Sequence, residues 1–191
     1  SSKGRASNNT DTDMELSLTS VVLATSLDKS GIDFVVYDDE DIIEKFKDKL
    51  EREIEFGIRY VCISTTFFWD MKHLNNVIKF FHDRDSNIKI ILGGQGLMVW
   101  GDSAYEKLEN VFCFCYGDID YFGEYLTKLL NSEIPNDFKL KRSKNGRSFY
   151  TVTKIIDDLD SLFLPDWGLL RRYDFNDNYY ATHPFPERVS V

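Results

Sequence analysis

The chain has 191 residues with 32 acidic and 23 basic side chains, so its formal net charge at neutral pH is −9. This balance argues against a duplex nucleic-acid binder, because neutralisation of phosphates by lysine and arginine dominates the affinity of such proteins. No stretch approaches the roughly 20 apolar residues that a membrane span needs. We therefore expect neither nucleic acid nor a membrane as a partner. The three cysteines each lie within an apolar run, which favours buried free thiols and a reducing, cytoplasmic location.

The first residues divide into a polar leader and a helix. Residues 1–13 are polar and predict a disordered leader. From Met14 onward, apolar residues recur at helical spacing, and Gly31 follows as a helix stop. The β-branched pair Val21 and Val22 leaves a strand open as an alternative for this segment.

After Gly31, short apolar runs alternate with amphipathic segments. The predicted strands are 33–38, 60–64, 88–92 and 111–116. The predicted helices are 41–56, 73–82, 103–108 and 121–130. This alternation implies right-handed crossovers and a parallel sheet. Because the strand 111–116 is apolar or thiol-bearing on both faces, we expect helices on both sides of it. The sequence thus predicts a three-layer α/β domain with a mostly parallel sheet over residues 14–134.

Residues 135–191 have a different pattern. The runs 138–141 and 148–152 flank a turn and predict a β-hairpin, whose basic side chains we interpret as a solvated face. From Ile155 onward there is little periodicity, and three prolines interrupt the chain. We expect an extended segment that wraps over the domain or links it to a following one.

Polar residues and glycines follow three of the predicted strands. Ligands of open parallel sheets bind beyond the carboxyl ends of the strands, so we expect these loops to line one cleft. The hydroxyls could bond a polar ligand or cap the next helix, and the glycines could admit a bulky ligand or permit a tight turn. The candidate binding residues are Ser64, Thr65, Thr66, Gly93, Gly94, Gln95, Gly96, Gly117 and Asp118.

Signals for catalysis are weak. The three histidines, His73, His82 and His183, have no metal-ligand spacing around them, and no nucleophile elbow or P-loop is present. The glycine run at 93–96 reads G-G-x-G and does not follow the first strand, which fits a dinucleotide fingerprint poorly. The residues by themselves therefore point to neither a catalytic residue nor a metal site.

The order of several strings resembles cobalamin (B12)-binding-type domains that precede radical SAM domains. Residues 16–38 are similar to the first helix and second strand of that family. The string IKIILGGQG at 88–96 is similar to its strand ending in a double glycine, and 114–118 to its glycine-acid turn. Residues 155–162 with 165–167 look like the linker that joins the two domains.

This resemblance implies a flavodoxin-like, Rossmann-like domain with cobalamin over the carboxyl edge of the sheet, contacted by the candidate residues above. Phe67, Phe68 and Trp69 would pack against the corrin rim or beneath the linker. The parent would be a radical SAM enzyme in which this domain positions the corrinoid for methyl transfer or radical chemistry. The 4Fe-4S cluster and S-adenosylmethionine would belong to the radical SAM barrel of the same protein. That barrel would follow residue 191, and its cysteine motif is not in this sequence.

The sequence departs from that family in two places. The segment Asp70–His73 reads D-x-x-H instead of the motif that supplies a lower histidine ligand. Residues 1–13 cannot form the hydrophobic strand that the family places before its first helix, so we expect a split sheet. The alternative is therefore a degenerate domain that binds no cofactor and serves as a docking or substrate-recruiting module. Its bulky residues would fill the corrin space: Phe67, Phe68, Trp69, Met98 and Trp100. A nucleotide-binding or receiver-like domain is a third possibility, without a phosphate loop or acidic triad to support it.

Overall fold

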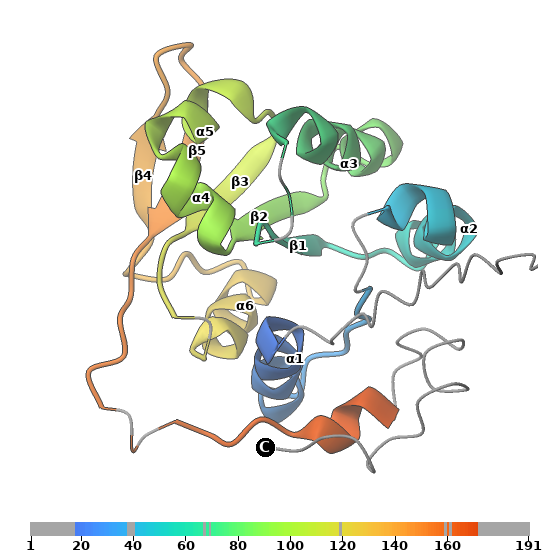
Figure 1. The fold of residues 1–191 in the computed structure, drawn as a ribbon, viewed down its shortest axis with the longest axis vertical. Helices are drawn as coiled ribbons and strands as arrows, with labels where there is room; N and C mark the ends of the chain where they lie inside the picture. The colour runs from blue at the N-terminus through green and yellow to red at the C-terminus, as the bar shows by residue number, and fades with distance from the viewer. Residues whose placement is uncertain are drawn as a thin grey trace, which may run out of the picture.

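The computed structural model describes residues 18–37, 41–66, 68, 70–118, 120–158, 160 and 162–171. Over these residues the chain is an α/β fold built on a five-stranded sheet with the strand order β1-β2-β3-β5-β4 (Figure 1). Strands β1, β2, β3 and β5 are parallel, and β4 pairs antiparallel with β5. The prediction of an α/β fold with a mostly parallel sheet is confirmed.

The strands are β1 (Tyr60–Ser64), β2 (Lys89–Gly93), β3 (Val111–Cys115), β4 (Lys139–Arg142) and β5 (Ser148–Val152). The helices are α1 (Leu18–Lys29), α2 (Ile42–Glu55), α3 (Met71–Arg84), α4 (Gln95–Trp100), α5 (Asp102–Lys107), α6 (Phe122–Leu130) and the 3-10 helix η2 (Trp167–Arg171). Every strand and helix predicted between residues 41 and 152 is present, with ends that move by at most two residues. The sequence missed α4, which begins where a glycine loop was predicted.

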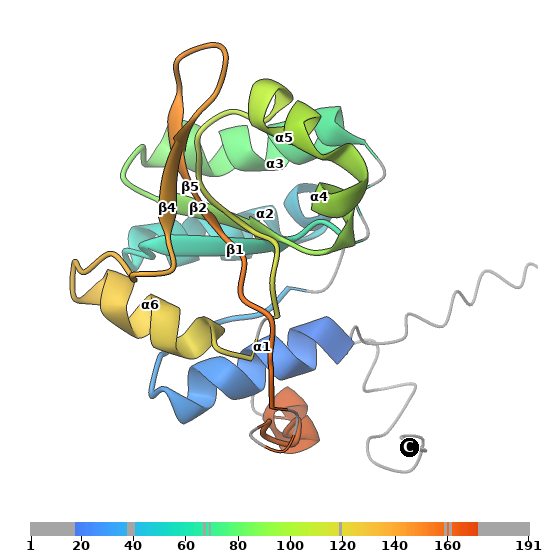
Figure 2. The same cartoon turned by 90° about the vertical axis from the view of Figure 1, so that its left-hand side faces the viewer.

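The sheet separates two apolar clusters, because successive side chains of a strand point to opposite faces. Ile90 and Phe114 lie in the cluster covered by α2, α3, α4 and α5. Ile91 and Cys113 lie in the cluster covered by α1 and α6. Figure 2 shows α1 and α6 together on one face of the sheet, opposite α3, α4 and α5. This arrangement confirms the predicted three layers.

Residues Leu18–Lys29 form the helix α1, so the helix predicted after Met14 is confirmed and the strand alternative is wrong. Helix α1 packs closely on α6. The hydroxyl of Ser26 donates to the carbonyl of Asp120 over 2.7 Å and accepts from the N–H of Gly123 over 2.9 Å. A Cβ at Gly123 would collide with the Ser26 carbonyl and the Ser30 hydroxyl, so glycine permits this approach. The Ser26 hydroxyl thereby satisfies backbone groups at the start of α6.

The prediction of a strand at 33–38 is wrong over the described residues. Residues 32–37 form no strand, and Asp38 lies outside the part that the structure describes. The segment is held by its side chains: Phe34 packs into the α1–α6 cluster, and the Tyr37 ring lies 5.2 Å from that of Phe46. The physical reason is the lack of a neighbouring strand among the residues that the structure describes, since a strand needs a hydrogen-bonded partner and β1 lies across a cavity from this segment.

The predicted hairpin is present and belongs to the sheet, because β5 pairs in parallel with β3. Beyond β5, the chain passes α6 and α1 before it forms η2 (Figure 2). Leu169 in η2 is fully buried. The predicted leader 1–13 and residues 172–191, with His183, lie outside the described residues. None of the helices that the structure describes is long and apolar enough to cross a membrane.

Candidate functional site

The three predicted loops lie at one edge of the sheet. Strands β1, β2 and β3 are parallel neighbours, so the loops that follow them all begin at the carboxyl edge. Ser64–Thr66 follows β1, Gly93–Gly96 spans the end of β2 and the start of α4, and Gly117–Asp118 follows β3. The topology therefore brings together the segments that the sequence singled out.

The first two loops are bonded to each other. The backbone N–H of Thr65 donates to the carbonyl of Gly93 over 2.7 Å, and the Thr65 hydroxyl accepts from the N–H of Leu97 over 3.2 Å. Thr66 Oγ1 accepts a weaker bond, 3.4 Å, from the N–H of Gln95. Thr65 is fully buried. Its hydroxyl thus accepts from the first turn of α4. The sequence left open a cap on the next helix along the chain, but that helix, α3, is capped by Asp70.

The glycines of this site face other parts of the chain. Gly94 has a φ of +95°, and a Cβ there would lie 2.8 Å from Thr66 Oγ1. A Cβ at Gly96 would lie 2.5 Å from the Thr65 carbonyl. Gly93 differs, because its Cβ would meet only ordinary contacts at 3.9 Å. The space that Gly94 and Gly96 open is therefore filled by the loop after β1.

The third loop holds the segment after β5. The N–H of Asp118 donates to the Lys154 carbonyl over 2.8 Å, and Asp118 Oδ2 accepts from the N–H of Ile156 over 2.7 Å. A Cβ at Gly117 would collide with the Lys154 backbone. Gly117 and Asp118 thus fasten residues 154–156 to the end of β3.

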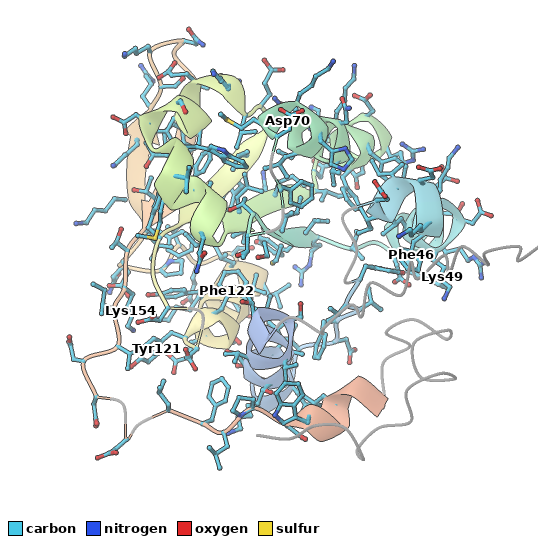
Figure 3. All side chains as sticks on the ribbon, in the orientation of Figure 1. Phe46, Lys49, Asp70, Tyr121, Phe122 and Lys154 are labelled. Carbon is cyan, nitrogen blue, oxygen red and sulfur yellow. The ribbon has the colours of Figure 1, made fainter. Side chains whose placement is uncertain are left out.

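The side chain of Lys154 strengthens this attachment. Its Nζ lies 3.8 Å from the centre of the Tyr121 ring and 3.9 Å from Asp137 Oδ2. Figure 3 shows Lys154 beside Tyr121 and Phe122 at the start of α6. The Tyr125 hydroxyl donates to the same Asp137 oxygen over 2.8 Å. Burial is the main cause that raises the pKa of Tyr125, and this bond to a carboxylate raises it further.

Two of the three thiols, those of Cys62 and Cys113, are held in the neutral form. Burial raises the pKa of Cys62 well above its ordinary range. The contact of Cys113 with Cys115, whose sulfurs lie 4.0 Å apart, raises that of Cys113, and burial adds to the effect. Thiols held in the neutral form are poor nucleophiles and poor metal ligands. Among the described residues, no group of three or more His, Cys, Asp or Glu side chains is placed to hold a metal.

A cavity of about 870 Å³ lies along the outer edge of β1. On one side α1 and α6 line it, with Leu27 and Leu126, and on the other α2 and α3, with Leu50 and Val77. Residues 32–37 form the wall opposite β1, and most of the lining side chains are apolar. Of the nine predicted binding residues, Ser64 alone is among those lining it. The other lining residues were missed because nothing local in their sequence marks β1 as an edge strand.

Of the three aromatic residues that follow β1, the structure describes Phe68. Phe68 lines the same cavity, and its ring lies 5.6 Å from that of His73. Phe67 and Trp69 lie outside the described residues. On α4, the side chain of Met98 is 74% exposed, so it does not fill space at the carboxyl edge.

No protein-family model matches the chain, and neither a curated protein nor a solved structure was found to be similar to it. The resemblance to cobalamin-binding-type domains therefore stays a prediction, and the geometry above is the basis for a functional proposal.

Proposed function

We propose that this chain is a docking domain whose cavity along β1 binds an extended, apolar segment of another polypeptide. The observation that carries the proposal is the mainly apolar cavity of about 870 Å³ beside an edge strand. Its volume lies within the range of pockets that bury most of a ligand. An exposed sheet edge beside apolar walls is the arrangement by which domains bind extended peptides.

The residues at the carboxyl edge do not fit a corrinoid well. A bulky planar ligand would need the backbone at Gly94, Gly96 and Gly117 to be open, and all three positions are closed by other parts of the chain. The Thr65 hydroxyl is fully buried and already bonded to Leu97. We derive no cofactor chemistry for this chain. The degenerate cobalamin-type domain, acting as a docking module, is the form of the family resemblance that agrees best with this geometry.

The rival prediction is a corrinoid-binding domain that precedes a radical SAM barrel, which would bring the iron–sulfur cluster and S-adenosylmethionine. A cytoplasmic setting also stays a prediction, supported by three cysteines that are all free thiols. Two titrations of one folded preparation separate the two functions. Hydroxocobalamin is followed by absorbance after desalting. A labelled peptide with the core Val-Ile-Val-Ile-Val between lysine pairs is followed by fluorescence anisotropy.

The docking proposal predicts saturable binding of the peptide and no retained corrin absorbance. Val35 lines the cavity and is 48% exposed, so Val35→Lys should weaken peptide binding by about tenfold without disturbing the fold. Leu164 is 87% exposed and does not line the cavity, so Leu164→Lys is a control with the same added charge. Retained cobalamin at a near-stoichiometric ratio, or equal peptide binding by both variants, would contradict the proposal.

A further inference from the structure

The outer edge of β1 carries backbone groups that face the cavity. The N–H of Lys89 donates to the carbonyl of Arg59, and that of Thr65 to the carbonyl of Gly93, so the odd-numbered residues of this strand face β2. Because backbone groups alternate along a strand, the N–H and C=O of Tyr60, Cys62 and Ser64 face away from β2. Within the part of the chain that the structure describes, these three residues have no backbone hydrogen bond on that side.

The two edges of the sheet are built differently. At the far edge, β4 has the sequence KLKR, and its three basic side chains protect that edge from pairing with another chain. At the near edge, β1 has the sequence YVCIS, with no charge and no proline. A strand that is uncharged on both faces is typical of the interior of a parallel sheet covered by helices. The composition of β1 therefore fits a strand that has a neighbour on each side.

The wall opposite β1 has the same character. Residues 32–37 read IDFVVY, with strand-like composition and no strand pairing. Helices cover the cavity between this segment and β1 on both sides, α1 and α6 on one, α2 and α3 on the other. The cavity thus has apolar layers above and below it and strand-like sequences along its two edges.

We infer that the cavity receives one β-strand of a partner polypeptide, about five residues long, aliphatic on both faces and parallel to β1. The inference rests on the proposed docking function and specifies its ligand. The length follows from β1, which spans Tyr60–Ser64. Aliphatic side chains are required on both faces because each face meets a buried apolar layer. Parallel pairing agrees with the helix-covered parallel sheet that the strand would extend.

The two ends of this sequence that lie outside the described residues do not offer such a strand. Residues 1–17 contain few apolar side chains, and residues 172–191 contain no run of four aliphatic residues. Strands β2, β3 and β5 already pair on both sides, and β4 is mostly basic. In a second copy of the chain, the remaining described candidates are β1 and residues 32–37, and both already line the cavity of their own copy.

The decisive test compares peptides, so that the protein stays unaltered. The first is the Val-Ile-Val-Ile-Val peptide with flanking lysines. The second has the core Thr-Ser-Thr-Ser-Thr with the same charge. The third and fourth have the aliphatic core with alternate backbone nitrogens methylated, one for each of the two alternate patterns. Strand addition predicts that binding weakens by about tenfold or more for the polar core, since less apolar area is buried. One of the two alternate methylation patterns should have a similar effect, since it removes the donors that face β1.

Amide hydrogen exchange and a spin label then locate the peptide. Bound peptide should slow exchange of the Tyr60, Cys62 and Ser64 amides. A spin label at its N-terminus should broaden signals near Tyr60, whereas an antiparallel strand would broaden those near Ser64. Antiparallel placement, or full binding by both methylated peptides, would overturn the strand inference and leave the docking function standing. Failure of the aliphatic peptide to bind would overturn both the strand inference and the proposed docking function. A dimer of the free chain that the peptide dissociates would overturn the assignment to a partner.

Discussion

The backbone N–H of Asp166 donates a 2.8 Å hydrogen bond to Oγ1 of Thr25, a residue 141 positions earlier in the chain. The Thr25 hydroxyl in turn donates to the Val21 carbonyl over 2.7 Å, and the side chain is 1% exposed. Together with the bonds of Asp118 to residues 154–156, this contact fastens the segment after β5 at two places. The predicted linker is therefore attached to the loop before α6 at residues 154–156 and to α1 at Asp166.

Thr25→Val should loosen the end of this segment. Valine keeps the shape of the side chain but removes the acceptor for the Asp166 amide, so we expect a loss of about 1 kcal/mol in the free energy of unfolding. Hydrogen exchange should quicken at residues 166–169. Thr127→Val is a matched control, because the Thr127 hydroxyl bonds a carbonyl of its own helix, that of Gly123. Equal changes in both variants by urea denaturation would argue against a specific role for the Thr25 contact.

Gly117→Ala should be destabilising, because its Cβ would collide with the Lys154 backbone. Overpacking of this kind costs about 1–3 kcal/mol, and we expect the released residues 154–156 to become accessible to proteases. Gly93→Ala is the control at a neighbouring loop, since its Cβ meets only contacts at 3.9 Å. Its free energy of unfolding should stay the same or rise by up to about 1 kcal/mol. Urea denaturation measures the stability of both variants, and limited proteolysis measures the access to residues 154–156. Equal results for the two variants would contradict the prediction.

Thr65→Val should destabilise the protein even though it preserves the volume of the side chain. The hydroxyl is one of two acceptors for the Leu97 amide, the other being the Gly94 carbonyl at 3.3 Å, so the variant loses one hydrogen bond, worth about 1 kcal/mol. Thr65→Ser keeps the hydroxyl and should retain more of the stability. If the valine variant unfolded at the same urea concentration as the unaltered protein, the hydroxyl would not be acting as a helix cap.

Much of the fold could be predicted from the sequence, because the pattern of apolar residues determines which faces are buried. Ile90, Ile91 and Leu92 are consecutive apolar residues in a run too short for an ordinary helix, and a strand covered on both faces buries all three. The segment 33–38 shows the limit of this reasoning. Its composition favours a strand, but no local pattern reveals whether a neighbouring strand exists to pair with it.

The position of the candidate site could be predicted from the sequence, but the role of its residues could not. Parallel topology places Thr65, Gly94 and Gly117 at one edge whatever they do there. Whether Gly94 makes room for a ligand or for Thr66 depends on how closely two loops approach, and that distance follows from the packing of the start of α4 against the loop after β1. The cavity was missed because strand order, which is set by the whole chain, determines that β1 lies at an edge.

Stability should fall at alkaline pH, and Tyr125 should account for part of the fall. The pKa of Tyr125 is raised in the folded protein by burial and by its bond to Asp137, whereas an unfolded tyrosine titrates near pH 10. Above about pH 10 the unfolded chain therefore loses a proton that the folded chain keeps, so stability is present below this pH and lost above it. Tyr125→Phe should make the decline in unfolding free energy between about pH 9 and 11 shallower. It should also lower stability at neutral pH by about 1 kcal/mol, because the bond to Asp137 is lost. Asp137→Asn tests the cause, since it removes the carboxylate charge and leaves the burial. The decline in unfolding free energy of Asp137→Asn should be shallower than that of the unaltered protein and steeper than that of Tyr125→Phe. If Tyr125→Phe declined as steeply as the unaltered protein, the alkaline loss of stability would belong to other tyrosines, such as Tyr60 and Tyr116, whose pKa values are also raised by burial.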